Sequence, residues 1–214
     1  MAEMVRTFIA IVLSREAHEA LGEVIGRLRA CPGNEAGRWV KPESIHLTLK
    51  FLGDVPSTKL EAVYAAIQRA CATVPPFAMY VEGVGCFPNV RRPRVVWAGV
   101  REETGRLAAL QRAVEREMAK EGFAPEERAF TPHLTLARIK ERADRADVEA
   151  LGSAVSQEQF ALATPVWVKE VYVMKSDLRP EGAIYTPLFR APLAGYPPRP
   201  ASRVLLLFRG GRGF

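Results

Sequence analysis

Two histidines of this chain lie in the same four-residue word, His-Leu-Thr-Leu, which begins at His46 and again, unchanged, at His133. The copies are 87 residues apart, and the chain has only 3 histidines. In an extended strand, side chains alternate between the two faces. Each copy would therefore present an imidazole and a hydroxyl on one face, with two leucines behind them. Two facing copies would make a site of paired histidines and paired threonines.

Paired imidazoles suit proton transfer at a phosphate ester. The unperturbed pKa of histidine, near 6.5, lets one ring accept a proton while the other donates one. One histidine can deprotonate an attacking water while the other protonates the departing oxygen. The hydroxyls of Thr48 and Thr135 can bind the non-bridging oxygens, and Arg138 or the arginines at 91, 92 and 94 can balance their charge.

Two other interpretations use the same residues. Alternating polar and apolar residues also describe any half-buried strand, in which a histidine has only a structural role. A catalytic zinc site commonly takes three protein ligands. Neither copy contains an acidic residue or a second histidine, and His18 falls on an amphipathic helix. We therefore expect no metal and no other cofactor.

The composition is ordinary for a globular chain, with an excess of positive charge. Of 214 residues, 48% are hydrophobic and 25% charged, and the net charge of +6 favours an anionic partner such as RNA. No apolar run reaches the roughly 20 residues of a membrane span, and the N-terminus lacks the features of a secretory signal. The 3 widely spaced cysteines form no CxxC pair. These features predict a cytoplasmic protein, and we expect a monomer.

Hydrophobic periodicity predicts a mixture of strands and helices. Short connections favour antiparallel pairing, which places the chain in the α+β class. Ser14 and Ser57 are the expected N-caps of the first two helices. The predicted strands cover residues 6–13, 45–52, 77–84, 95–100, 133–139, 165–174 and 183–190, and the predicted helices cover 15–30, 57–71, 105–120 and a charged run at 140–149.

Longer sequence segments around the two motifs resemble those of the two-histidine (2H) phosphoesterase superfamily. Within it they are similar to the RNA 2′,3′-cyclic phosphodiesterase branch, whose members are also named 2′-5′ RNA ligases. The similar segments follow the family's order over about residues 5 to 191: residues 8–10, 45–54, 87–88, 93–97, 130–138 and 176–178, with Gly182 and Tyr185.

This resemblance implies a bilobal α+β fold, in which two pseudo-symmetric lobes of antiparallel sheet and helices each supply one motif to a central cleft. It implies metal-independent hydrolysis of 2′,3′-cyclic phosphate ends of RNA or nucleosides to 2′-phosphates. His46 would be the proton donor and His133 the proton acceptor, and Thr48 and Thr135 would hold the phosphate. Arg138 and Arg94 complete the expected substrate-binding set. Formation of 2′-5′ RNA linkages, or a non-catalytic nucleotide- or RNA-binding module, are the alternatives.

The resemblance stops near Pro192, which predicts one bilobal domain at residues 1–192 and a C-terminal extension at 193–214. The extension contains a proline-rich stretch at 196–200, an apolar run at 204–208 that reads as a short strand, and an RGG-like ending. We expect the extension to have no part in catalysis.

Overall fold

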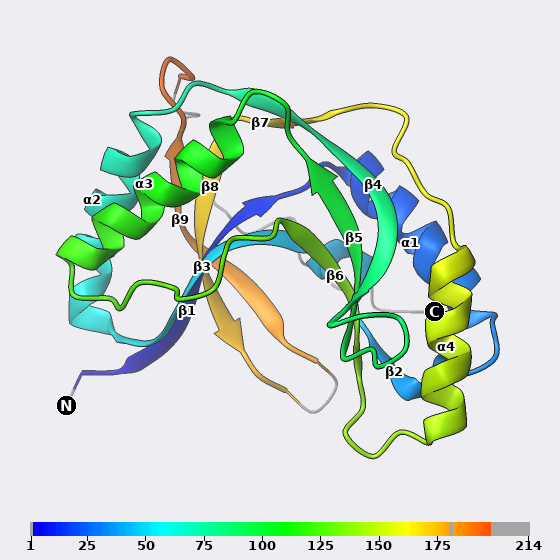
Figure 1. The fold of residues 1–214 in the computed structure, drawn as a ribbon. Coiled ribbons are helices and arrows are strands. Elements are labelled where there is room, and N and C mark those ends of the chain that lie inside the picture. Colours follow the sequence, from blue (N-terminus) through cyan, green and yellow to red (C-terminus); the bar gives the residue numbers. More distant parts are fainter. Residues whose placement is uncertain (1, 180–181, 198–214) are drawn as a thin grey trace, which may run out of the picture.

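The computed structural model describes residues 2–179 and 182–197, in which nine strands form one antiparallel sheet (Figure 1). The sheet order is β7-β4-β5-β6-β3-β1-β8-β9, with β2 paired to β6. The strands are β1 (Met4–Val12), β2 (Gly37–Trp39), β3 (His46–Pro56), β4 (Phe77–Phe87), β5 (Val95–Arg101), β6 (His133–Ile139), β7 (Val166–Val168), β8 (Glu170–Asp177) and β9 (Ile184–Pro192). The helices are α1 (Arg15–Arg29), α2 (Leu60–Cys71), α3 (Arg106–Lys120) and α4 (Arg145–Gln157). The expected α+β class is confirmed.

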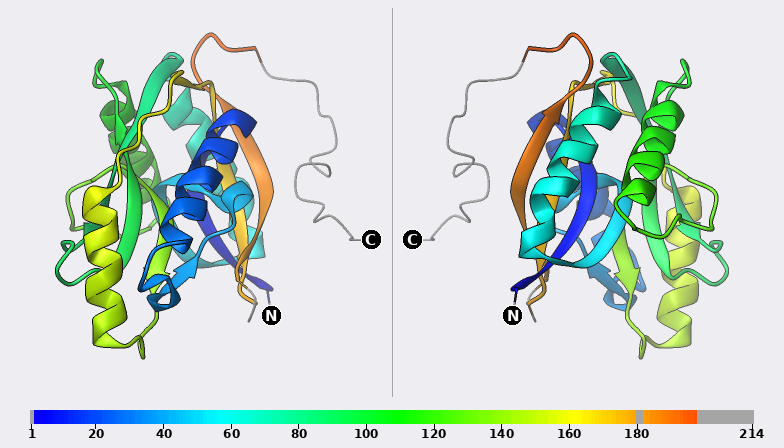
Figure 2. Two further views of the ribbon diagram at one scale, coloured as in Figure 1. Left: turned by 90° about the vertical axis from the view of Figure 1, so that its right-hand side faces the viewer. Right: turned by 90° about the vertical axis from the view of Figure 1, so that its left-hand side faces the viewer.

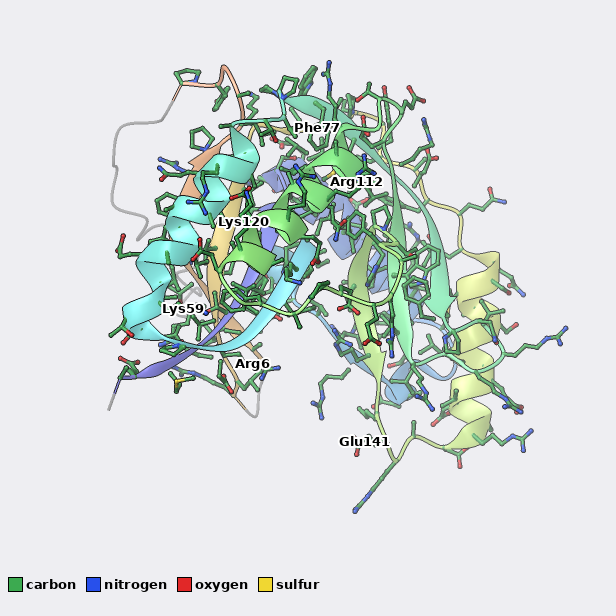
Figure 3. All side chains as sticks on the ribbon, turned by 60° about the vertical axis from the view of Figure 1, so that its left-hand side comes forward. Arg6, Lys59, Phe77, Arg112, Lys120 and Glu141 are labelled. Carbon is green, nitrogen blue, oxygen red and sulfur yellow. The ribbon has the colours of Figure 1, made fainter. Side chains whose placement is uncertain are left out.

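The order of elements repeats along the chain. The series β1-α1-β3-α2 is followed, after β4, by the series β5-α3-β6-α4. The first helix of each series packs against the second helix of the other, so α1 contacts α4 and α3 contacts α2. Figure 1 shows these pairs on opposite sides of the molecule, and Figure 2 shows each from its own side. In Figure 3, α2 and α3 run side by side, with Lys59 just before α2 and Lys120 at the end of α3.

The sheet curves round on itself. Strands β7 and β8 are separated by a single residue, Lys169, yet β7 pairs with β4 near one end of the sheet order and β8 pairs with β1 and β9 near the other. A connection of one residue cannot span a flat sheet of this width, because neighbouring strands lie about 4.8 Å apart. The two ends of the sheet are therefore close in space, and one face is concave.

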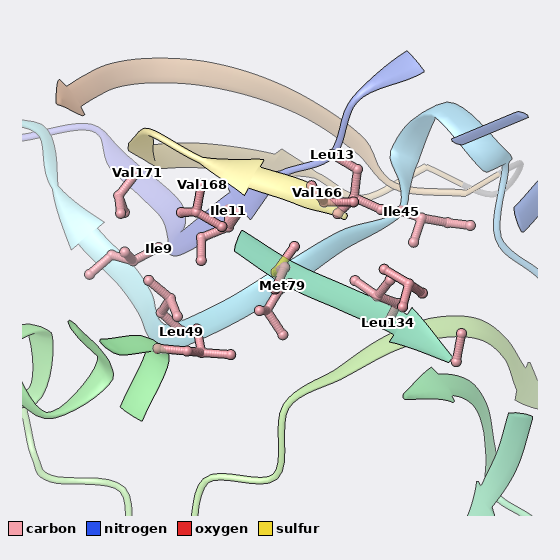
Figure 4. Close-up of a cluster of buried hydrophobic side chains, with 14 of the residues drawn as sticks. Ile9, Ile11, Leu13, Ile45, Leu49, Met79, Leu134, Val166, Val168 and Val171 are labelled. Atoms are coloured by element: carbon pink, nitrogen blue, oxygen red, sulfur yellow. The ribbon is translucent and has the colours of Figure 1, made fainter. Parts of the chain in front are cut away.

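The apolar face of the sheet forms the main core with the helices. Leu49 and Leu134 from the repeated words lie in this core with Ile9 and Ile11 of β1 (Figure 4). The helices add their apolar stripes, among them Leu21 of α1, which is fully buried. The repeated leucines therefore anchor β3 and β6 from behind, as expected.

Several local features differ from the sequence-based predictions. Ser14 caps α1 as expected, but α2 begins after a 3-10 turn (Ser57–Lys59), so Ser57 is not its N-cap. The charged run at 140–149 is only partly helical, because Asp144 caps α4 and moves its start to Arg145. The strand predicted at 165–174 breaks at Lys169, and the short strand β2 was not predicted. The predicted strand at 204–208 lies outside the described residues.

Candidate active site

Strands β3 and β6 meet at the middle of the sheet, where Leu47 lies opposite Leu134 in an antiparallel pair. Each of these leucines is the second residue of its copy of the His-Leu-Thr-Leu motif, so a pseudo-two-fold axis passes between them. The register set by this pair brings His46 across from Thr135 and Thr48 across from His133. The histidines are then diagonal neighbours, which in ordinary sheet geometry are about 7–8 Å apart at the backbone. That spacing accommodates a phosphate between two imidazoles.

The two strands carry the same irregularity behind their motifs. In the β1–β3 register, the partners step from Thr48 to Lys50 and skip Leu49. In the β5–β6 register, they step from Thr135 to Ala137 and skip Leu136. Each strand therefore has a bulge at the same position of the repeat, and the alternation of side chains between the faces shifts by one residue beyond it.

The bulges add one residue from each copy to the face that carries the histidines. Lys50 and Ala137 turn into the protein and are buried, so Phe51 and Arg138, five residues after the histidines, return to the histidine side. The burial pattern is identical in the first seven residues of β3 and β6. We call the set His46, Thr48, Phe51, His133, Thr135 and Arg138 the histidine face.

Both imidazoles are held in the same way. Nδ1 of His46 lies 2.8 Å from the carbonyl oxygen of Ser44, and Nδ1 of His133 lies 2.7 Å from that of Thr131. A carbonyl oxygen can only accept, so each Nδ1 carries the proton. Nε2 of each ring is thereby left to accept a proton when the ring is neutral and to donate one when it is charged.

Aromatic rings surround the two histidines unequally. His46 contacts Phe8, with ring centroids 4.7 Å apart, and meets Tyr185 edge-on at 4.9 Å. His133 meets Phe87 edge-on at 5.0 Å. The pKa of His46 is lowered to about 4, mainly by burial and to a smaller extent by the nearby His18 and Arg138, against the hydrogen bond to Ser44 that raises it. His46 is therefore neutral at pH 7 when the site holds no anion.

Two arginines face one another at the edge of the histidine face. Arg138 of β6 lies directly opposite Arg38 of β2, both are exposed, and neither forms an ion pair within residues 2–179 and 182–197. Like charges opposite one another on a sheet destabilise it, and a bound anion relieves the repulsion. Arg94 precedes β5, and its backbone bonds to Phe87 and Ile139, while its side chain is exposed.

Some predicted arginines lie apart from the site. Arg91 and Arg92 line a cavity of about 430 Å³ between the β4–β5 loop and α4, and no residue of the histidine face lines it. Their expected help with phosphate charge is therefore not supported by their position. Among the described residues, no group of three or more His, Cys, Asp or Glu could hold a metal ion.

Sequence reasoning missed two residues that lie next to the motifs, His18 and Trp97. His18 of α1 bonds through Nε2 to the carbonyl oxygen of Ile45, 2.9 Å away, next to His46. Trp97 of β5 lies opposite Thr135, and its buried indole N–H has no protein partner in the described part of the chain. The sequence carried no signal for these contacts, because neither the position of α1 against Ile45 nor the order of the strands was predictable from the residues.

The fold and the site together define the class of protein. A curved antiparallel sheet that brings two His-x-Thr strands together about a pseudo-two-fold axis is the arrangement expected of a 2H phosphoesterase. The family model of the 2′-5′ RNA ligase superfamily matches residues 17–180. The chain belongs to this family.

Similar proteins carry consistent names. The chain is 35% identical over 182 residues to an RNA 2′,3′-cyclic phosphodiesterase of Methanothermobacter thermautotrophicus, covering 85% of this chain and 95% of the relative. An RNA 2′,3′-cyclic phosphodiesterase of Aquifex aeolicus is 33% identical, with 86% and 95% covered. Among solved structures, E. coli LigT complexed with 3′-AMP superimposes with a TM-score of 0.70 at 30% identity, covering 89% of this chain and 99% of LigT. None of the helices in the described residues is long and apolar enough to cross a membrane.

Proposed function

We propose that this protein hydrolyses the 2′,3′-cyclic phosphate end of RNA, or of a nucleoside, to a 2′-phosphate, using His46 and His133 as an acid–base pair without a metal. The chain is an enzyme of the RNA 2′,3′-cyclic phosphodiesterase type, as the names of its relatives support. The observation that carries the proposed mechanism is the pair of imidazoles whose Nδ1 atoms bond to backbone carbonyls, each beside a threonine on one sheet face.

In the proposed reaction, a water oxygen attacks phosphorus and the bond between phosphorus and the ribose 3′ oxygen breaks. Nε2 of neutral His133 takes a proton from the water, and Nε2 of charged His46 gives its proton to the departing 3′ oxygen. Solvent then restores both protonation states. Thr48 and Thr135 donate hydrogen bonds to the non-bridging oxygens, and Arg138 offsets the charge that develops there.

Electrostatics link substrate binding to this mechanism. His46 is neutral at pH 7 in the free protein because burial lowers its pKa to about 4. A proton donor must be charged, and an anionic phosphate beside the imidazole favours the charged form. The substrate itself therefore supplies the charge that keeps the His46 proton in place. The same anion offsets the repulsion between Arg38 and Arg138.

Turnover of adenosine 2′,3′-cyclic phosphate tests the proposal. Wild-type protein is compared with His46→Ala and His133→Ala, with and without EDTA, and the product is separated chromatographically. We expect the 2′-phosphate as product, no loss with EDTA, and losses in kcat of roughly 10²–10⁴-fold in each variant. A 3′-phosphate as the sole product, EDTA-sensitive turnover, or folded variants with normal kcat would each overturn part of it. Turnover absent in the wild type would favour a non-catalytic binding module.

A further inference from the structure

The cavity between the tip of the β4–β5 loop and helix α4 has an excess of positive charge. Its volume is about 430 Å³, and its charged lining consists of three arginines, Arg91, Arg92 and Arg145, and one carboxylate, Glu149. Arg145 and Glu149 pair with each other at 2.7 Å, whereas Arg91 and Arg92 form no ion pair among the residues that the structure describes. Two guanidinium groups at this cavity are therefore available to an anionic ligand.

The loop that carries Arg91 and Arg92 is held in a defined shape. The Oδ1 atom of Asn89 accepts hydrogen bonds from the backbone N–H groups of Arg91 and Arg92, at 3.0 and 3.1 Å. The main chain of the loop also lies directly against α4, because a methyl group added at Gly152 would be 2.0 Å from the carbonyl oxygen of Val90. The backbone of the two exposed arginines is thus in place before an anion binds, which lowers the entropy cost of binding.

Both ends of this loop lie at the second motif. Phe87, which precedes the loop, meets the His133 imidazole edge-on at 5.0 Å, and Val95, which follows it, lies opposite Arg138. Four residues of chain span at most about 14 Å, so the backbone of Arg91 lies within that distance of Phe87. The cavity is therefore close to the histidine face, although no residue of the histidine face lines it.

We infer that this cavity binds an internal phosphate of the RNA strand whose cyclic phosphate end lies between the two histidines. This inference rests on the proposed function and specifies its substrate as an RNA strand in preference to a free nucleoside cyclic phosphate. A guanidinium group suits a phosphodiester, because its planar fork of N–H groups can bind two oxygens at once. The hydroxyl of Ser153, also in the lining, is a further donor. A mononucleotide at the histidines has no second phosphate to place in the cavity, whereas a strand can occupy both sites.

The test compares the binding of two ligands: adenosine 2′-phosphate, and an RNA of about ten nucleotides that ends in the same adenosine 2′-phosphate. In the variant that combines Arg91→Ala with Arg92→Ala, the Kd for the RNA should rise roughly 10-fold at about 50 mM salt. The Kd for adenosine 2′-phosphate should stay within about 2-fold of wild type. The slope of log Kd for the RNA against log salt concentration should fall by about 1.4, because each phosphate contact to a single strand contributes about 0.7.

The matched control combines Arg112→Ala with Arg116→Ala. Both arginines are exposed on α3, which packs against α2 on the opposite side of the molecule from α4 (Figure 1), and their loss removes the same charge. This control should bind both ligands within about 2-fold of wild type. A further variant, Ser153→Glu, adds a carboxylate to the cavity and should weaken RNA binding roughly 10-fold, whereas Ser153→Gln should not.

Three results would overturn the inference: an equal loss of affinity for both ligands, an equal loss in the two double variants, or an unchanged salt slope in the Arg91 and Arg92 variant. Binding is measured without turnover, so these results are independent of catalysis. A wild-type protein that binds the RNA through the cavity but does not hydrolyse adenosine 2′,3′-cyclic phosphate would support the inference and count against the proposed function.

Discussion

Inorganic phosphate should raise the pKa of His46. In the free protein that pKa is lowered to about 4 from 6.5, mainly by burial. At 1.36 kcal/mol per pH unit, the protein disfavours the charged imidazole by about 3 kcal/mol. A unit negative charge about 4 Å away, at an effective dielectric constant near 20, stabilises the charged imidazole by about 4 kcal/mol. The pKa of His46 with a phosphate bound should therefore lie near or above 6.5.

NMR titration of the imidazole signals measures this change directly. With only 3 histidines in the chain, His18→Gln and His133→Gln variants suffice to assign the signals. Titrations from pH 3 to 8, with and without saturating phosphate, should give the two pKa values of His46. A value near 6.5 in the free protein, or no rise with bound phosphate, would refute the reasoning that the substrate charges the proton donor.

The remaining predictions concern kinetics and stability. His46→Ala combined with His133→Ala should lose much less kcat than the product of the single losses, because either change already removes the concerted transfer, and steady-state kinetics on all three variants tests this. Between pH 6.5 and 4, His46 is protonated in the unfolded state but not in the folded state. The free energy of unfolding should therefore fall by up to about 3 kcal/mol as the pH drops through this range. Urea titrations should show a smaller fall for His46→Gln. Lys50→Met should destabilise the fold by about 2–4 kcal/mol in the same assay, because the Lys50 ammonium is buried 2.7 Å from Glu115. Lys120→Met removes an exposed ammonium and leaves its buried partner Glu117 paired with Arg69, so it should cost less than about 1 kcal/mol. Arg138→Ala should raise the KM for cyclic phosphates and weaken its dependence on salt, measured from 50 to 200 mM.

Much of the local structure was predictable from the residues. Strand β6 has the predicted bounds, residues 133–139, and the helices predicted at 15–30 and 105–120 match α1 and α3 to within one residue. Turn and cap details were less predictable. Ser57 has the chemistry of an N-cap, but the chain makes a 3-10 turn there before α2 begins. A short strand such as β2 has no periodicity of its own, and its existence depends on β6 beside it.

The sequence by itself determined which side chains share a strand face within each copy, because a period of two puts His46 with Thr48 and His133 with Thr135. The sequence could not show that both strands have a bulge. Without the bulges, strict alternation does not place Phe51 and Arg138 on the histidine face. Only the tertiary structure brings the two copies together. The Leu47–Leu134 pair joins their strands, and the helices of one series pack against the helices of the other. The lowered pKa of His46 has the same origin, since burial depends on Phe8 and Tyr185, which reach the ring from other strands.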